Sequence, residues 1–170
     1  GIGVKEIPDN HFQADLNAIA AAVTEKTGMI ILANPNNPTG TYVNEKAFIA
    51  FMDRIPEEVL VVCDEAYFEY VVEKDYPQTL QLQARYPNLI CTRTFSKVYG
   101  LAGLRIGYGI AHEAIIELVN RIRQPFNVNH LGQVAAMAAL RDQTFVQKCI
   151  LLNEQGKKQY YEKLTALGID

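Results

Sequence analysis

A lysine set among hydroxyl-bearing and small residues, Lys97, lies eight positions before Arg105 in this 170-residue chain. From residue 94 to residue 105 the chain reads Thr-Phe-Ser-Lys-Val-Tyr-Gly-Leu-Ala-Gly-Leu-Arg. A lysine amine forms a Schiff base with a carbonyl compound, and the planar fork of an arginine side chain binds phosphate. The residue types and their spacing therefore indicate a lysine that holds a phosphorylated aldehyde. A solvated surface loop is the alternative interpretation of this segment taken alone.

Further polar side chains follow apolar runs that have the character of buried strands. The apolar runs are residues 29–33, 59–63 and 89–92. The first run leads to Asn37, the second to Asp64 and Tyr67, and the third to Lys97 and Arg105. In open α/β sheets, ligands bind beyond the carboxyl ends of the strands. We therefore expect the three strands to deliver these side chains to one edge of a sheet.

Each of these polar residues also has a purely structural interpretation. Asn37 lies in an Asn-Pro-Thr-Gly sequence that is typical of turns, and Asp64 could cap the turn after its strand. Tyr67 could be a core aromatic residue, and Arg105 an ordinary surface cation. The structural interpretations must all hold at once to replace the functional one.

Taken together, the segments resemble the signature of the fold type I pyridoxal-phosphate aminotransferases. The matching positions, in chain order, are Asn37-Pro-Thr-Gly40, Asp64, Tyr67, Ser96-Lys97 and Arg105. Within that family, the sequence around these motifs is most similar to the histidinol-phosphate aminotransferases, particularly over residues 94–97, 101–108 and 123–129.

The resemblance implies that Asp64, Tyr67 and Asn37 bind the ring of pyridoxal phosphate. Asp64 would pair with the protonated pyridine nitrogen and keep the ring an electron sink. Tyr67 and Asn37 would donate hydrogen bonds to the phenolate oxygen and stabilise its negative charge. Replacing Asp64 should cripple the chemistry, and replacing the other two should shift the pH titration of the cofactor.

The resemblance also assigns Lys97 two roles: it would bind the cofactor covalently and then move a proton as acid and base. Arg105, Ser96 and Thr94 would hold the phosphate, the arginine as a charged fork and the hydroxyls as neutral donors. Lys97 is thus the predicted catalytic residue, and the other three anchor the cofactor.

The implied reaction is transamination between histidinol phosphate and 2-oxoglutarate in histidine biosynthesis, so the partners are a small-molecule amino donor and a 2-oxo acid. Three alternatives stay open: an aromatic aminotransferase, a threonine-phosphate decarboxylase, and a non-catalytic aminotransferase-like domain, which could belong to a transcription regulator. Family members usually pair, so we expect a homodimer.

The length predicts an incomplete enzyme. Residues 1–170 resemble part of the pyridoxal-phosphate-binding large domain, and residues 145–170 read as a helix that leads toward a missing small domain. Residues 1–8 read as a strand already inside a sheet, followed by a loop. The family's upstream phosphate-binding turn and downstream substrate-binding arginine are not in this sequence. We therefore expect residues 1–170 by themselves to lack full transaminase activity.

Composition argues against several other classes. The net charge of −3 gives no basic surface for nucleic acid. No apolar run is long enough to span a bilayer, and the first residues lack the pattern of a secretory signal, so we expect a cytoplasmic protein. The cysteines (Cys63, Cys91, Cys149) and histidines (His11, His112, His130) are dispersed. We expect reduced thiols, solvated or hydrogen-bonded imidazoles, and no metal site.

The periodicity predicts an α/β fold: a three-layer sandwich with a mostly parallel sheet, one antiparallel strand and helices on both faces. The expected helices are residues 14–25, 44–55, 112–123, 131–140 and 145–167, and the expected strands are the three apolar runs with residues 105–111. The short connection at residues 100–103 favours an antiparallel last strand. The alanine-rich helix at 131–140 is expected to be buried.

The glycines between residues 103 and 109 do not form a dinucleotide-binding loop, because they lie within a strand-like run and not between a strand and a helix. Gly107 and Gly109 would share one face of that strand, where a side chain would crowd a neighbouring helix or the cofactor. For the aromatic residues Tyr99 and Phe126 we expect core packing; contact with the substrate or with a partner subunit is the alternative.

Overall fold

The computed structural model describes residues 1–4 and 11–169. The chain divides into two compact units. We call Gly1–Thr94 with Gly107–Asn127 the sheet unit, and Phe95–Ile106 with Val128–Asp170 the helical unit. Each unit has its own internal structure, and the predicted cofactor residues are divided between them.

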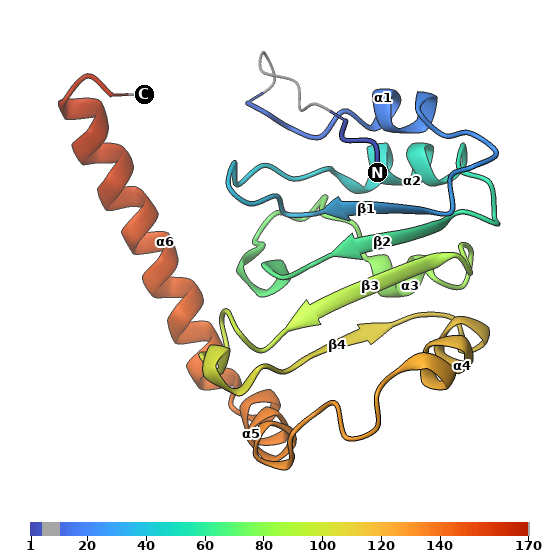
Figure 1. The fold of residues 1–170 in the computed structure, drawn as a ribbon. Coiled ribbons are helices and arrows are strands. Elements are labelled where there is room, and N and C mark those ends of the chain that lie inside the picture. Colours follow the sequence, from blue (N-terminus) through green and yellow to red (C-terminus); the bar gives the residue numbers. More distant parts are fainter. Residues whose placement is uncertain (5–10, 170) are drawn as a thin grey trace. The chain divides into compact units, whose positions relative to one another are not determined.

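A four-stranded mixed sheet forms the centre of the sheet unit (Figure 1). The strands, in the spatial order β1-β2-β3-β4, are β1 (Met29–Ala33), β2 (Leu60–Asp64), β3 (Leu89–Thr94) and β4 (Gly107–Ile110). The first three strands are parallel, and β4 runs antiparallel to β3. The predicted α/β fold, with a mostly parallel sheet, one antiparallel strand and helices around it, is confirmed.

One face of this sheet carries the hydrophobic core of the unit. Side chains alternate along β1, so Ile30 and Leu32 are buried whereas Met29 and Ile31 are exposed. The buried positions of β2 and β3 continue the same face. The core cluster consists of Ile30, Leu32, Val43, Phe48, Phe51, Met52, Ile55, Val59, Val61, Cys63, Tyr86, Leu89 and Cys91. The two strand cysteines are thus free, buried thiols, as the sequence predicts.

The helices α1 (Leu16–Ala21) and α2 (Glu45–Met52) contribute to this core and begin at side-chain caps. Asp15 accepts a hydrogen bond from the Ala18 backbone, and Asn44 caps α2 in the same way. Both helices are shorter than predicted.

The early end of α1 has a local cause. The Thr27 hydroxyl accepts a hydrogen bond from the Thr24 backbone N–H at 2.9 Å, and the Thr24 hydroxyl accepts one from Lys26 N–H at 3.3 Å. Threonine side chains that bond to nearby backbone groups compete with helix formation. The apolar spacing that predicted a helix to residue 25 continues past the point where these turn bonds begin.

The remaining helices are α3 (Thr79–Leu82), α4 (Glu113–Ile122), α5 (His130–Arg141) and α6 (Gln143–Ala166). The last three lie where the sequence predicts them, and α3 was not predicted because a four-residue helix has too few positions for a periodic pattern. His112 caps α4: its ring nitrogen Nδ1 accepts a hydrogen bond from Ala114 N–H at 3.3 Å.

Three expectations are wrong for the described residues. In α5 only Gly132 and Ala136 are buried, so the helix is not the buried element that its alanine content indicated. Phe126 is 97% exposed and does not pack in a core. Residues 1–4 form no strand, and residues 5–8 of that prediction lie outside the described part.

Within the described residues, no helix has both the length and the apolar character required to cross a membrane.

Candidate functional site

The carboxyl ends of the three parallel strands meet at one edge of the sheet. Ala33 at the end of β1 pairs in register with Asp64, and Asp64 pairs with Thr92. The backbone N–H of Asn34 donates a hydrogen bond to the carbonyl oxygen of Asp64 at 3.0 Å. The expected convergence of the asparagine-containing turn and the aspartate is therefore confirmed.

Asn37 and Tyr67 come together from different loops at this edge. The amide nitrogen Nδ2 of Asn37 lies 2.8 Å from the Tyr67 hydroxyl oxygen, although the residues are thirty positions apart. The Asn37 loop closes through a backbone bond from Gly40 N–H to the Asn36 carbonyl at 2.9 Å, and Gly40 has φ of +70°. Glycine adopts this left-handed conformation without steric cost. Asn37 therefore lies in a turn, as its structural interpretation predicted, and it also lies next to Tyr67.

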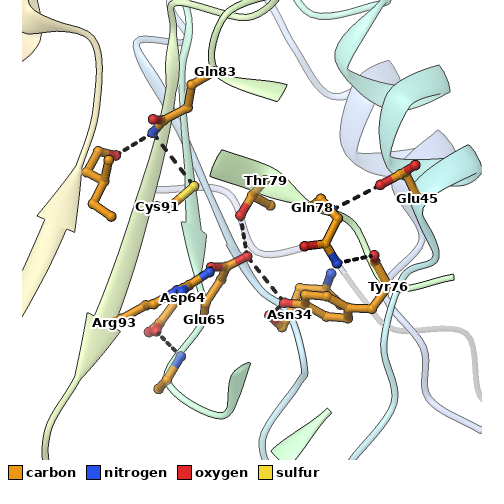
Figure 2. A network of polar contacts seen from close by, with 12 residues as sticks. Asn34, Glu45, Asp64, Glu65, Tyr76, Gln78, Thr79, Gln83, Cys91 and Arg93 are labelled. Carbon is orange, nitrogen blue, oxygen red and sulfur yellow. Dashed lines mark hydrogen bonds and ion pairs between the residues drawn. The ribbon is translucent and has the colours of Figure 1, made fainter. Parts of the chain in front are cut away.

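Asp64 is half-buried at the last position of β2. Its Oδ1 accepts a hydrogen bond from Ala66 N–H at 3.1 Å (Figure 2). This contact caps the turn after β2, as the structural interpretation of Asp64 predicted. No other residue in the described part of the chain hydrogen-bonds this carboxylate. An ionised carboxylate accepts several hydrogen bonds, so Asp64 can cap its turn and still accept one from a protonated ring nitrogen.

Thr94 ends β3 and pairs with Gly107 of β4. A Cβ atom on Gly107 would lie 2.8 Å from the Arg93 carbonyl oxygen and 3.5 Å from the Thr94 Cα. The same atom on Gly109 would have the Cys91 carbonyl oxygen at 3.8 Å, an ordinary contact. Crowding therefore applies to Gly107 alone, and the crowded neighbour is the β3 backbone and not a helix.

The helical unit carries the lysine on a loop that folds back on itself. Phe95 N–H donates to the Ile106 carbonyl at 3.1 Å, and Gly100 N–H donates to the Lys97 carbonyl at 2.9 Å. Phe95 and Tyr99 are buried, with ring centroids 5.0 Å apart, whereas Lys97 is exposed. Tyr99 therefore packs in a core, as expected, and the buried aromatic residues anchor the loop that presents Lys97 to solvent.

Arg105 lies at the end of the same loop in a left-handed backbone conformation, with φ of 51° and ψ of 54°. Its guanidinium nitrogen Nη1 donates to the Ala102 carbonyl at 2.8 Å and lies 3.5 Å from the Ser96 hydroxyl. A charged fork and a hydroxyl, both at the surface of the unit, are suitable donors for a phosphate. The structure thus brings together two of the three predicted phosphate ligands.

The structure divides the predicted residues into two groups. Asn37, Asp64, Tyr67 and Thr94 belong to the sheet unit, whereas Ser96, Lys97 and Arg105 belong to the helical unit. Among them, Asn37 bonds to Tyr67, and Arg105 bonds to Ser96.

Sequence reasoning missed a buried polar network next to the first group (Figure 2). Glu65 is fully buried, and its Oε2 forms an ion pair with the Arg93 Nη2 at 2.9 Å. Its Oε1 accepts hydrogen bonds from the Thr79 hydroxyl at 2.6 Å and from the Tyr76 hydroxyl at 3.4 Å. Two charged residues at the ends of apolar runs were the signals that could have indicated the pair: Glu65 is the second residue after the run 59–63, and Arg93 directly follows the run 89–92.

Burial governs the ionisation of this network. It raises the pKa of the Glu65 carboxyl, and the hydrogen bond from Thr79 and the positive charge of Arg93 oppose that shift. Burial also raises the pKa of the Tyr76 hydroxyl, and the neighbouring Glu65 adds to the increase. Tyr76 therefore stays a protonated hydrogen-bond donor at physiological pH.

Comparison with known proteins identifies the class of protein to which the chain belongs. The family model "Aminotransferase class I and II" matches residues 1–167, so the chain belongs to this family.

Among the curated proteins with similar sequences are several histidinol-phosphate aminotransferases. The enzyme of that name from Bacillus velezensis is 52% identical over 170 residues, which cover 99% of this chain and 47% of that protein. The one from Brevibacillus brevis is 52% identical over 169 residues, covering 99% and 46%. The chain spans about half the length of these curated relatives.

A solved structure agrees with these relatives. Histidinol-phosphate aminotransferase from Sinorhizobium meliloti, crystallised in complex with pyridoxal-5′-phosphate, matches with a TM-score of 0.75 and 40% sequence identity. The match covers 81% of this chain and 37% of that chain.

The different surroundings of the two β4 glycines predict different tolerance to a methyl group. Gly107→Ala should push β4 away from β3 beside Thr94, because the Arg93 carbonyl is backbone and cannot rotate away. We expect a loss of about 1–3 kcal/mol in the free energy of unfolding. Gly109→Ala, the matched control on the same strand, should cost less. Denaturant unfolding of both variants measures the difference, and equal losses would contradict it.

Proposed function

We propose that this chain is part of a pyridoxal-phosphate-dependent aminotransferase that transfers the amino group between histidinol phosphate and 2-oxoglutarate in histidine biosynthesis. The observation that carries the proposal is the 52% identity to a histidinol-phosphate aminotransferase along 99% of the chain. The motif residues of the predicted site lie within this aligned length.

The side chains present match the chemical groups of pyridoxal phosphate. The chain offers one amine for the aldehyde, one carboxylate for the ring nitrogen, two donors for the phenolate oxygen, and one cation with hydroxyls for the phosphate. When bound, this cofactor supplies an electron-withdrawing ring that stabilises the carbanion formed when a substrate loses its α-proton.

In the proposed site, the sheet unit controls the charge on the ring. Asp64 would accept a hydrogen bond from the ring nitrogen and keep the nitrogen protonated, because a carboxylate next to a protonated nitrogen favours the charged form. Asn37 and Tyr67 bind the phenolate oxygen together. Their 2.8 Å contact places both polar groups at one point, where a single oxygen can be bound by both.

The lysine loop performs the attachment and the proton transfer. Lys97 would hold the cofactor through its Nζ, and the same amine would carry a proton to and from the substrate α-carbon. Arg105, Ser96 and Thr94 are the residues that would hold the phosphate. An exposed Lys97 on an anchored loop suits this task, because the amine must be accessible while its backbone is held.

The proposal includes the wider organisation implied by the family. Residues 1–170 form part of the pyridoxal-phosphate-binding large domain, and residues 145–170 lead toward a small domain. The complete protein is a cytoplasmic homodimer that takes a small-molecule amino donor and a 2-oxo acid. Groups for the far end of the substrate come from segments outside this sequence, which spans about half of its relatives.

Lys97 should be the single site of covalent attachment. Incubation of the full-length protein with pyridoxal phosphate, followed by borohydride reduction and peptide mass mapping, should yield one adduct at Lys97. Lys97→Ala should yield none and should lower kcat by at least about 10²–10⁴-fold, the usual contribution of positioned proton transfer. A surface lysine variant, Lys46→Ala, serves as the control. Scattered labelling in the unsubstituted protein would argue against the proposed role.

Substrate selectivity tests the proposed reaction directly. The full-length protein should transfer the amino group of histidinol phosphate to 2-oxoglutarate with a higher kcat/KM than that of any aromatic amino acid. The reaction is followed by the formation of glutamate, with L-phenylalanine and L-tyrosine as competing donors. Activity restricted to aromatic amino acids would exclude this reaction while leaving the cofactor in place.

Tyr67→Phe should raise the pH midpoint of the absorbance change of the bound cofactor. Loss of the hydroxyl removes a hydrogen bond from the phenolate oxygen, whose stronger negative charge then holds the neighbouring proton more tightly. We expect a shift of about one pH unit, since a hydrogen bond to a charged group is worth about that much. Spectrophotometric titration without substrate measures it, and an unchanged or lower midpoint would contradict the assignment.

A further inference from the structure

The buried ion pair of Glu65 and Arg93 lies directly beside the residues proposed to bind the cofactor ring. Glu65 follows Asp64 in the chain, and its backbone N–H donates to the Thr92 carbonyl at 2.9 Å, which extends the pairing of β2 with β3. Both of its carboxylate oxygens are bonded. The residue after Asp64 is therefore held by backbone and side chain together.

Arg93 contacts the loop that follows β2 and carries Tyr67. Its Nε donates to Glu65 Oε2 at 2.9 Å, and its guanidinium carbon lies 3.5 Å from the centroid of the Phe68 ring. Phe68 follows Tyr67, and its backbone N–H donates to the Glu65 carbonyl at 3.0 Å. Arg93 also interacts with Tyr108, its partner across the antiparallel pair of β3 and β4. The pair thus includes the residue after Asp64, and its arginine packs on the residue after Tyr67.

Tyr76 connects the ion pair to the loop that carries Asn37. Its hydroxyl donates a hydrogen bond to the backbone carbonyl of Asn34 and lies 3.4 Å from Glu65 Oε1 (Figure 2). The side chain of Asn34 is itself held in both directions: its Oδ1 accepts from Val43 N–H at 2.7 Å, and its Nδ2 donates to the Val43 carbonyl at 3.2 Å. The start of the Asn37 loop is therefore bonded to the same network.

We propose that Glu65, Arg93 and Tyr76 are positioning residues, which hold Asp64, Tyr67 and Asn37 in the orientation that sets the charge distribution of the bound cofactor. This inference rests on the proposed function, because it assigns a role toward the cofactor of that same site. None of the three positioning residues is given contact with the cofactor or the substrate; they act through the neighbouring residues that they hold.

A role in stability alone does not explain the choice of side chains. Two charges withdrawn from water lose their hydration, and well-packed apolar residues of similar volume often stabilise a core as well or better. What a buried, hydrogen-bonded ion pair does provide is fixed direction, because both carboxylate oxygens of Glu65 and the Nε and Nη2 of Arg93 have defined partners. Here those partners are Thr79 of α3, Tyr76 just before α3, and Phe68 in the loop after β2. Tyr76 in turn bonds to Asn34 at the start of the Asn37 loop.

Several titratable groups surround Glu65 and share its environment. They are Arg93 and Cys91 on β3, Cys63 and Asp64 on β2, Tyr76 before α3, Tyr108 on β4, and Glu69 in the loop after β2. A test of positioning must therefore leave the charges of this group balanced, so that a change in cofactor titration reports geometry and not a new nearby charge.

Tyr76→Phe meets that condition, since it removes one hydroxyl and leaves the ion pair intact. In the full-length holoenzyme, we expect it to raise the pH midpoint of the cofactor absorbance by about 0.3–0.5 unit, in the same direction as Tyr67→Phe and by less. Tyr86→Phe is the matched control, because Tyr86 is also buried and its hydroxyl bonds to Asp53 at 2.5 Å, outside this network. The control should titrate like the unsubstituted protein.

A second variant tests the ion pair itself without changing the net charge. The double substitution Glu65→Gln with Arg93→Gln should raise the same midpoint by about one unit, because Asp64 and Tyr67 lose their shared support. Circular dichroism of the apo form checks folding in parallel. If the double variant does not fold, Tyr76→Phe alone decides the question.

The outcomes separate this inference from the proposed function. If the protein binds the cofactor but the Tyr76→Phe variant and the Tyr86→Phe control have the same pH midpoint, the positioning role is overturned and the proposed function still stands. A lowered midpoint would also overturn it, because displaced donors can only strengthen the phenolate charge. If the unsubstituted protein forms no adduct at Lys97 with pyridoxal phosphate, both the proposed function and this inference fail.

Discussion

Parallel pairing of β1, β2 and β3 in one register is the constraint on which the sheet unit depends. The pairing aligns Ala33 with Asp64 and Asp64 with Thr92, so that the chain leaves all three strands at the same edge. Polar residues lie at or just after the ends of these strands, with Asp64 at the last position of β2 and Thr94 at the last position of β3. A shift of one residue in any strand would turn its buried side chains to the opposite face and move these polar residues away from the edge.

The two groups of proposed cofactor residues are supported by different means. In the sheet unit, loops are held by strand ends and by the buried network around Glu65. In the helical unit, Lys97 lies on a loop that is anchored by buried Phe95 and Tyr99, with Arg105 bonded back to Ser96. In both cases a few half-buried or exposed polar side chains are attached to backbone that burial or hydrogen bonding restrains. Such an arrangement limits the entropy that a ligand must remove on binding.

Prediction from the sequence succeeded where the signal was local and failed where it depended on surroundings. The apolar run at β1 has the same bounds in prediction and structure, and α6 differs by two residues at its start. The helix α1 ended early because Thr24 and Thr27 form turn bonds. The exposure of Phe126 could not be read from its residue type, because burial is a property of what lies next to a side chain in space.

The sequence by itself determined the strand order along the chain and the antiparallel last strand, because these depend on periodicity and loop length. It also identified the family and the residues that match its motif, through the resemblance of these motif residues to the family's signature. Only the tertiary structure decided that Asn37 bonds to Tyr67, that Gly107 is crowded while Gly109 is not, and that Glu65 pairs with Arg93. These contacts join residues far apart in the chain, or distinguish neighbours of identical type. Their existence depends on strand register and on loop paths, which no local pattern of residues contains.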